Sequence, residues 1–555
     1  MKIYNSATHT KEEFVPHEPG KVSMYTCGPT VYHFAHIGNL RSYIMEDVLE
    51  KLLRYAGYDV TRVMNITDVG HLASDADTGE DKMLKGAQRE HKTVMEIAQF
   101  YTDAFFADCK KLNIKYPDVV QPATGMIGDY IKVISSLIDR GYAYFAGGNV
   151  YFDTSKLEKY YVFNDHDEED LAVGVREGVE EDANKRNKND FVLWFTKSKF
   201  EDQALKWDSP WGVGYPGWHI ECSGISMKYN GEYLDLHCGG VDNAFPHHTN
   251  EIAQSESYLG HPWCPHWCHV AHLNTDHGKM SKSKGEFLTV SLLEEKGYDP
   301  LAYRFFCLQS HYRKSLVFTW ENLDNATVAY NKLLSKIAAL KDEGEVDRAA
   351  FDEYKAKFMA AMDNDLNTSM AVTVLYDVLK AKTNDKTKLA LLDSFDTVLG
   401  LKLLEKAAAL RAKQAAAPAA GEFAVISEDG EVNADVEALI RARADAKKAK
   451  NFAEADVEFT AEMRRGSELF GHLTRIDFIK CDVEGYEVVI MEEMRPLLER
   501  FRPTVLIETG GENRDRIVAL FTELGYDAYT LHRGQEIPLR AGSKKDIIFR
   551  PKKKR

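Results

Sequence analysis

Long apolar segments are absent from this chain of 555 residues. No run approaches the roughly 18 apolar residues that a membrane-spanning helix needs, and the opening segment MKIYNSATHTKEEFVP lacks the apolar centre of a secretion signal. Cysteine is sparse, with 8 residues, which excludes a disulfide-stapled scaffold. Proline and glycine, with 16 and 37 residues, are too few for a collagen or a low-complexity chain. We therefore expect a cytoplasmic protein with reduced thiols and no membrane segment.

Positive charge is also in deficit, because 70 Lys and Arg face 86 Asp and Glu, for a net charge of −16. An acidic chain is not an obvious nucleic-acid binder, since phosphate contacts need Lys and Arg, although a local basic surface is compatible with this balance. Hydrophobic residues make up 44% and charged residues 28%, which indicates globular domains with buried cores. At roughly 100–200 residues per domain, the length predicts about three to five domains.

Residues 21–70 have the pattern of a βαβ unit. KVSMYTC, at 21–27, and VTRVMNI, at 60–66, have the apolar and β-branched composition of strands. The segment between them stops at Gly57 and carries apolar residues at helical spacing, namely Leu40, Ile44, Val48 and Leu52. We expect this helix to begin directly after the sequence HIGN, so that its N-terminus offers free backbone N–H groups to an anion.

Two motifs of the kind that binds ATP stand far apart in the chain: His36-Ile37-Gly38-Asn39 and Lys279-Met280-Ser281-Lys282-Ser283. Attack of a carboxylate on the α-phosphate of ATP builds negative charge, which hydrogen-bond donors and ammonium groups must stabilise. The two lysines are compact charges on flexible stems, suited to a loop that closes over phosphates. In this order, with the first motif on a βαβ turn, the motifs resemble the two ATP-binding signatures of class I aminoacyl-tRNA synthetases. Taken singly, each motif is equally compatible with a charged surface turn.

Four residues of metal-binding type accompany these motifs. Cys27 ends the first predicted strand, and Cys222 lies in the segment PGWHIECSG. His247 and Glu251 stand four residues apart, so a helix would place both on one face. Thiolates, imidazole and carboxylate all suit zinc. Spacing alone leaves a second interpretation open, two buried thiols without a metal, because the cysteines are far apart in sequence.

Five segments extend the resemblance to one family. CGPTVYHFAHIGN, NITDVG, PGWHIECS, HCGGVDNAFPHHTNEIAQSE and GKMSKSKGEF follow one another in this order. Together they closely resemble the cysteinyl-tRNA synthetases over residues 1–456. The resemblance implies an α/β fold: a Rossmann-like class I synthetase catalytic domain with an insertion, then an α-helical bundle and a small C-terminal α/β segment.

The same resemblance implies roles for individual residues. It assigns one zinc ion per chain, which would bind the thiolate of the substrate, to the ligands Cys27, Cys222, His247 and Glu251. It places Trp218 and His237 around the cysteine pocket. For ATP with Mg²⁺ it implies the binding residues Thr30, His36, Gly38, Asn39, Asp242, Lys279 and Lys282. Within this set, the resemblance implies a catalytic role for His36, Asn39, Lys279 and Lys282.

Some residues depart from the family pattern or imitate a site. The signature usually ends in histidine, whereas Asn39 can donate a hydrogen bond but cannot carry positive charge. Thr249 stands where glutamate is frequent, but it is not an implied ligand. The segment HPWCPHWCHVAH, at 261–272, has the residue types of a second metal site. Its two tryptophans, Trp263 and Trp267, indicate packing instead.

The C-terminal part departs most from the family. Residues 165–192 are acidic and predict a solvated insertion, and the family's helical domain matches through residue 456. From about 470 onward, strand and helix patterns alternate. IDFIKCDVEGYEVVI followed by PTVLIET resembles the C-terminal half of FkbM-type SAM-dependent methyltransferases over residues 474–550. No glycine-rich loop precedes residue 474, so we expect no methyl transfer, and the segment that would contact the anticodon is replaced.

We expect seven segments, which in chain order have the following boundaries. They are the first half of the catalytic domain at 1–118, a connective insertion at 119–205, the second half of the catalytic domain with the zinc site at 206–275, the KMSKS loop and stem-contact region at 276–325, a helical bundle for tRNA at 326–410, a linker with a remnant of the anticodon-binding domain at 411–470, and the methyltransferase-like segment at 471–555.

The resemblance implies ATP-dependent activation of L-cysteine to cysteinyl-adenylate and transfer to tRNA(Cys). A monomer is our default expectation. The nearest alternative is a cysteine ligase with an amino-sugar acceptor, as in mycothiol synthesis, which would share both ATP motifs and the zinc. The helical region that includes RARADAKKAKNFAEAD favours tRNA. A methyltransferase and a non-catalytic RNA-binding paralogue are further alternatives, and the intact KMSKS motif and four intact ligands argue against the latter.

Overall fold

A computed structural model describes most of the chain: residues 1–69, 93–163, 182–197, 205–275, 278–279, 287–416, 475–481, 487–508, 511–532, 535–539 and 546–552. The chain divides into two compact units, residues 1–419 and residues 420–555. Within the described residues, no helix combines the length and the apolar character that crossing a bilayer requires.

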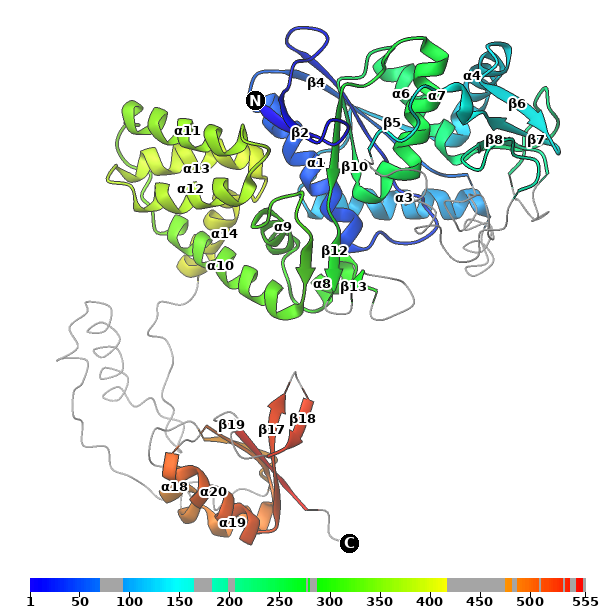
Figure 1. The fold of residues 1–555 in the computed structure, drawn as a ribbon. Helices are drawn as coiled ribbons and strands as arrows, with labels where there is room; N and C mark the ends of the chain where they lie inside the picture. The colour runs from blue at the N-terminus through cyan, green and yellow to red at the C-terminus, as the bar shows by residue number, and fades with distance from the viewer. Residues whose placement is uncertain are drawn as a thin grey trace. The chain divides into compact units, whose positions relative to one another are not determined.

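The first unit is built on a parallel sheet of five strands in the order β11-β10-β3-β4-β5. The strands are β3 (Lys21–Thr26), β4 (Asp59–Ile66), β5 (Val119–Pro122), β10 (Leu236–Gly240) and β11 (His266–Val270). Helix α1 (Ile37–Tyr55) connects β3 to β4, so the predicted βαβ unit is confirmed (Figure 1). β3 lies inside the sheet, between β4 from the N-terminal half of the unit and β10 from its C-terminal half.

Helices cover both faces of this sheet, as the alternation of side chains along the strands shows. Met24 of β3 packs in one apolar cluster with the α1 residues Leu40 and Ile44. The next residue, Tyr25, belongs to a second cluster with Ile220 of α6 (Trp218–Asn230). Successive strand residues point to opposite faces, so α1 and α6 lie on opposite sides of the sheet.

Helix α1 ends where its sequence predicts, but it begins at Ile37, inside the sequence HIGN and not after it. His36 is the N-cap, and its Nδ1 accepts a hydrogen bond of 3.1 Å from the backbone N–H of Asn39. The helix stops at Tyr55, followed by Gly57 with a φ of 97°, a backbone conformation that favours glycine. The predicted apolar stripe is fully buried: Leu40, Ile44, Val48 and Leu52.

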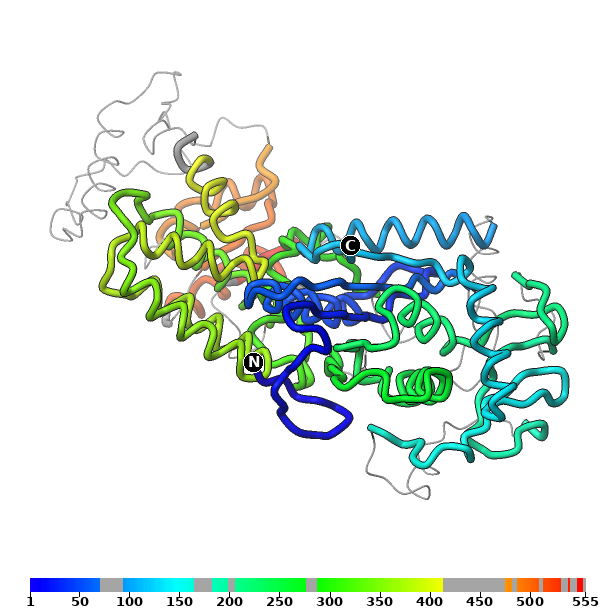
Figure 2. The backbone as a smooth tube through the Cα atoms, turned by 90° about the horizontal axis from the view of Figure 1, so that it is seen from above, coloured from blue at the N-terminus to red at the C-terminus, as the bar shows by residue number. Residues whose placement is uncertain are grey.

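Smaller elements flank the parallel sheet on two sides (Figures 1 and 2). One side carries an antiparallel sheet, ordered β6-β7-β8-β9, and helix α4. Its elements are α4 (Ile127–Asp139), β6 (Ala143–Ala146), β7 (Asn149–Phe152), β8 (Phe191–Phe195) and β9 (Tyr215–Pro216). Further elements around the sheet are β1 (Lys2–Asn5), β2 (Thr10–Glu13), α3 (Val94–Lys111), η3 (Val241–Asn243), η4 (Ala244–His248) and α7 (Thr249–Leu259).

The opposite side is helical, as predicted for residues 292–410. Its helices are α8 (Val290–Glu295), α9 (Pro300–Leu308), α10 (Trp320–Ala338), α11 (Arg348–Met362), α12 (Thr368–Lys380), α13 (Asp385–Leu399) and α14 (Leu403–Ala416). This part of the chain also forms a three-stranded sheet in the order β13-β12-β14. In the sequence, β12 (Leu273–Thr275) and β13 (Gly278–Lys279) precede α8, and β14 (Leu316–Phe318) lies between α9 and α10.

The second unit is a small α/β body with its own apolar core. Its sheet has the order β15-β16-β19-β17-β18, in which β15 and β16 are parallel and the other pairs antiparallel. The strands are β15 (Phe478–Cys481), β16 (Thr504–Glu508), β17 (Tyr526–His532), β18 (Gln535–Pro538) and β19 (Asp546–Pro551), and the helices are α18 (Glu487–Glu493), α19 (Arg495–Phe501) and α20 (Gly511–Glu523). The alternating strands and helices predicted for this region are confirmed.

Candidate active site

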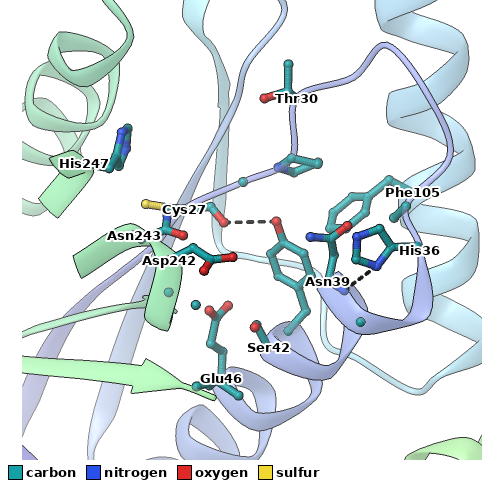
Figure 3. Close-up of a pocket in the computed structure, with 18 of the residues that line it drawn as sticks. Cys27, Thr30, His36, Asn39, Ser42, Glu46, Phe105, Asp242, Asn243 and His247 are labelled. Carbon is teal, nitrogen blue, oxygen red and sulfur yellow. Dashed lines mark hydrogen bonds between the residues drawn. The ribbon is translucent and has the colours of Figure 1, made fainter. Parts of the chain in front are cut away.

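The site lies where the order in which the strands are added to the parallel sheet reverses. From β3 the chain builds β4 and β5 on one side, and later β10 and β11 on the other, so the loops after β3 and β10 separate and leave a crevice between them. A cavity of about 420 Å³ occupies this position (Figure 3). Seven of the predicted binding residues line it together with Cys27: Thr30, His36, Gly38, Asn39, Trp218, Asp242 and His247.

Four metal-binding side chains converge at the cavity from segments that are distant in sequence. Cys27 follows β3, Cys222 lies in α6, His247 in η4 and Glu251 in α7. Their ligand atoms all lie within 4.8 Å of one another, with Cys222, His247 and Glu251 buried. The structure thus brings together the four residues that the family resemblance implies as ligands.

Three separations between these atoms lie close to the edges of a zinc tetrahedron. The two Sγ atoms are 3.9 Å apart, His247 Nε2 lies 3.4 Å from Cys222 Sγ, and the same nitrogen lies 3.1 Å from Glu251 Oε1. Zinc bonds of about 2.3 Å to sulfur and about 2.0–2.2 Å to nitrogen and oxygen give tetrahedral edges of about 3.8, 3.6 and 3.4 Å, respectively. The donor set and its geometry thus fit a zinc ion.

A second combination of donors shares part of this set. Cys27 and Glu251 also lie within 4.8 Å of His237 and His248. However, His237 Nε2 is 2.8 Å from Glu251 Oε2, and His248 Nδ1 is 2.8 Å from His269 Nε2, which are hydrogen-bond distances. Such outer partners orient a ligating carboxylate and fix the imidazole rings. The set that contains both thiolates is the better zinc site because zinc favours sulfur.

The electrostatics of the donors favour a cation. Burial raises the pKa of the Cys27 thiol well above its ordinary value, and neighbouring Cys222 and Glu251 raise it further. Burial also opposes ionisation of Glu251, but His237 and His247 outweigh it and lower the pKa of this carboxyl to about 2. Several acidic side chains thus share one buried place, and a dication would favour their charged forms.

Another part of the cavity is formed by the start of α1 and by the segment after β10. Gly38 and Asn39 lie in the first turn of α1, directly after the N-cap His36, and all three line the cavity. Figure 3 shows His36 and Asn39. Across the cavity, Asp242 Oδ1 lies 2.9 Å from Nε2 of His272. The backbone of Lys279 pairs with Asn274 at the β12–β13 hairpin. The side chain of Lys279 and all of Lys282 lie outside the described residues, as do most of the acidic segment 165–192 and the segment 441–456.

The prediction from the sequence did not include several residues that line the cavity. Ser42, Tyr43 and Glu46 follow Asn39 by three, four and seven residues, so they continue its face along α1. The hydroxyl of Tyr43 donates a 3.1 Å hydrogen bond to the carbonyl oxygen of Cys27 (Figure 3). Burial raises the pKa of the Glu46 carboxyl to about 8, although Arg62 opposes the rise. Helical periodicity from Asn39 was the available signal.

Two predicted aromatic positions have different surroundings. Trp218 lines the cavity and its ring lies 4.8 Å from that of His247, centroid to centroid. His237 is fully buried behind Glu251 and stacks on Trp267 at 4.6 Å, so its direct contact with a substrate stays a prediction. Trp263 and Trp267 are buried in the same apolar cluster as Tyr25 and Ile220, which confirms the packing role predicted for them.

Three protein families match successive parts of the chain. The class I (C) tRNA synthetase catalytic domain matches residues 13–328, and the DALR domain matches residues 357–404. The FkbM methyltransferase domain matches residues 404–528. This last match starts earlier and ends earlier than the range of 474–550 that the sequence motifs indicated.

Curated relatives cover most of the chain. The cysteine–tRNA ligase of Treponema denticola is 45% identical over 482 residues, which span 82% of this chain and 94% of that protein. The cysteine–tRNA ligase of Borreliella burgdorferi is 41% identical over 470 residues, with the same coverage. A solved methionyl-tRNA synthetase of Mycobacterium tuberculosis, bound by methionyl-adenylate, covers 79% of this chain and 97% of its own at 15% identity and a TM-score of 0.45, too loosely to place any site residue. By the identity and coverage of the two ligases, the chain belongs to the cysteine–tRNA ligase family of class I tRNA synthetases.

Proposed function

We propose that this chain is a cysteine–tRNA ligase, which activates L-cysteine with ATP and transfers the cysteinyl group to tRNA(Cys). One observation carries the proposal. Two thiols, an imidazole and a carboxylate converge within 4.8 Å at a cavity that is also lined by the N-terminus of α1. A sulfur-selective centre and an anion-binding helix end thus face the same space, as a reaction between cysteine and a nucleotide requires.

At the sulfur end of the cavity, we propose one Zn²⁺ per chain on Cys27, Cys222, His247 and Glu251. When bound, the ion supplies a soft Lewis acid for the thiolate of the substrate, and so separates cysteine from serine, which a hydrogen-bonding pocket distinguishes poorly. Zinc and its three anionic ligands sum to −1, so the ammonium group of cysteine acts as a counter-charge. Trp218 borders the substrate, and His237 acts through Glu251.

At the nucleotide end, the proton of His36 decides what the ring can donate. Nδ1 accepts from the backbone N–H of Asn39, so a neutral ring carries its proton on Nε2. We propose that Nε2–H and the N–H groups at the start of α1 donate to phosphate oxygens, together with the Asn39 side chain. Lys279 and Lys282, with Mg²⁺, would neutralise the leaving pyrophosphate. Thr30, Gly38 and Asp242 complete the proposed ATP site.

The reaction then has two steps. The carboxylate of cysteine attacks the α-phosphorus of ATP, the bond to pyrophosphate breaks, and cysteinyl-adenylate forms. A hydroxyl of the terminal ribose of tRNA attacks the carbonyl carbon, and AMP leaves. We assign tRNA contact to the helical bundle at 326–410, keep the other boundaries predicted from the sequence, and propose a monomer.

The test is cysteine-dependent exchange of pyrophosphate into ATP, followed by charging of tRNA(Cys). We expect exchange with cysteine but not with serine, and charging of tRNA but not of glucosaminyl-inositol. Exchange combined with charging of the amino sugar alone would favour the amino-sugar ligase. Absence of exchange from a zinc-loaded protein would contradict the proposal.

A further inference from the structure

The two cysteine ligands stand next to the ends of one buried hydrogen-bond chain. Its three side chains, Asn65, Thr67 and Glu221, are at most 1% exposed. One end of the chain is the backbone of Gly28, which follows Cys27, and the other is Glu221, which precedes Cys222. None of its three side chains lines the cavity. This hydrogen-bond chain therefore links the two thiol-bearing segments without lining the cavity.

Every hydrogen bond of this chain runs in the same direction. The N–H of Gly28 donates to Asn65 Oδ1 at 2.7 Å, Asn65 Nδ2 donates to Thr67 Oγ1 at 3.0 Å, and Thr67 Oγ1 donates to Glu221 Oε2 at 2.9 Å. The amide of Asn65 must accept with oxygen and donate with nitrogen, and the hydroxyl of Thr67 both accepts and donates. Bonds in such a series polarise one another, and a carboxylate oxygen of Glu221 is the final acceptor.

The backbone of the same segment fixes the loop that carries Cys27. The N–H of Thr67 donates to the carbonyl oxygen of Pro29 at 3.1 Å, and the carbonyl oxygen of Thr67 accepts from the N–H of Val31 at 3.2 Å. A Cβ at Gly28 would overlap the carbonyl oxygen of Asn65, so only glycine allows the loop to lie this close to the end of β4. The loop position is thus set by residues 65–67.

We infer that Asn65, Thr67 and Glu221 are positioning residues that hold Cys27 and Cys222 at the separation zinc requires; the inference rests on the proposed zinc centre. Their Sγ atoms are 3.9 Å apart, close to the tetrahedral edge of about 3.8 Å. Cys27 comes from a loop and Cys222 from a helix on one face of the sheet, so no single element fixes their distance. The hydrogen-bond chain does so, and the site is preorganised before metal enters.

The test compares three variants of the full-length chain: Thr67→Val, Thr67→Ser and Thr124→Val. Valine keeps the shape of threonine but cannot bond Asn65 or Glu221, whereas serine keeps the hydroxyl. The hydroxyl of Thr124 donates to Asp68 at 2.5 Å and is not part of the hydrogen-bond chain, so Thr124 is the matched control. Zinc affinity is measured by competition with a chelator, and the Co²⁺-loaded protein reports thiolate geometry through its absorption spectrum.

We expect Thr67→Val to weaken zinc binding by about 10- to 100-fold, the usual effect of losing an outer-shell partner, and to alter the cobalt–thiolate bands. Thr67→Ser and Thr124→Val should retain the affinity and the spectrum of the original chain. If Thr67→Val does not fold, Thr67→Ala removes the same hydroxyl with the same expectation. Equal affinity and spectra in all variants would overturn the positioning role alone. An original chain that binds neither Zn²⁺ nor Co²⁺ would instead overturn the zinc centre and leave exchange activity as the test of the proposed function.

Discussion

Cys27 and Cys222 are separated by 195 positions in sequence, yet they form one edge of the proposed metal site. The other cysteines have different environments. Cys264, for example, donates its thiol to the carbonyl oxygen of His266 and is not part of the donor set. The chain therefore offers a matched pair of cysteines at which a serine substitution should have opposite consequences.

Cys222→Ser should lose zinc, because a neutral hydroxyl is a far poorer zinc ligand than a thiolate. We expect zinc affinity to fall by more than the roughly 100-fold upper range for an outer-shell change, with loss of cysteine-dependent exchange. Metal content after dialysis and exchange activity are the measurements. Cys264→Ser should keep one zinc per chain. Full zinc content in Cys222→Ser would remove this residue from the ligand set.

Glu46→Gln should change the pH dependence of stability. The folded carboxyl has a pKa of about 8 because it is buried, against an ordinary value of 4.5. Between these values the folded state binds the proton more tightly, so this residue lowers stability as pH rises, by up to about 1.4 kcal/mol per pH unit. Glutamine cannot ionise, so the gain in melting temperature should be larger at pH 8 than at pH 5. A gain of equal size at both pH values would contradict the raised pKa.

At the residue level, chemistry was predictable and orientation was not. The four ligands follow from residue type and family resemblance. Glu46 was missed because a charged residue in a helix ordinarily faces solvent, whereas this one is 2% exposed on the cavity wall. The role of His237 depends on the sheet pairing that brings β10 under α7, which the local sequence does not encode.

Among the elements, α1 connects the site to the helical side of the unit. Its N-terminus carries His36, and further along its length Asp47 accepts 2.7 Å contacts from Lys51 and from Arg304 of α9. Arg304 also donates to the carbonyl oxygen of Leu399 at the end of α13. Asp47 and Arg304 are fully buried, so this ionic group fixes three helices together.

Arg304→Met should destabilise the first unit by about 3–5 kcal/mol, because it leaves a buried carboxylate short of its main partner. Urea unfolding measures the loss. Lys357→Met, which breaks an exposed pair with Glu353, is the control and should have no measurable effect. An Arg304→Met chain as stable as the original would show that this ionic group does not hold the helices.

The pH dependence of Arg304→Met follows from Asp47. Burial opposes ionisation of this carboxyl, but Arg304 and Lys51 outweigh it and lower its pKa. Its contribution to stability is therefore present above pH 4 and is lost as pH falls through the lowered value. Without Arg304, the acid loss should begin at a higher pH, which a series of melting temperatures would detect.

Elements with a strong period were predictable. The βαβ unit and the helices after residue 292 follow their apolar spacing. The antiparallel sheet of β6–β9 was not predicted, because its strands are short and β7 and β8 are separated by an acidic segment. The pairing of His247 with Glu251 was predicted from helical spacing, although α7 begins only at Thr249 and His247 lies in η4.

Across the whole molecule, the division into two compact units defines what a truncation removes. A chain ending at Ala419 keeps every described ligand and cavity residue and the complete first unit. Because a unit with its own core can fold alone, we expect cysteine-dependent exchange within about twofold of the full chain. Charging of tRNA(Cys) by both forms would then measure what the second unit contributes. Loss of exchange on truncation would contradict the division.

The second unit should not bind S-adenosylmethionine. The sequence before β15 contains no glycine-rich turn of the kind that cradles a nucleotide, although the FkbM family matches residues 404–528. Calorimetric titration of the full chain should give no heat of binding, with ATP as the positive control. Stoichiometric binding would revive methyl transfer as an activity.

The order of strands in the parallel sheet has a consequence for biosynthesis. β3 emerges early from the ribosome, but its partner β10 and the last donor, Glu251, follow only after α4 and the β6–β9 sheet have been made. A nascent chain shorter than this offers too few donors to capture zinc, however much is present. Assembly of the proposed zinc site is therefore tied to closure of the sheet, a late contact between sequence-distant segments, which is the slow kind of folding step.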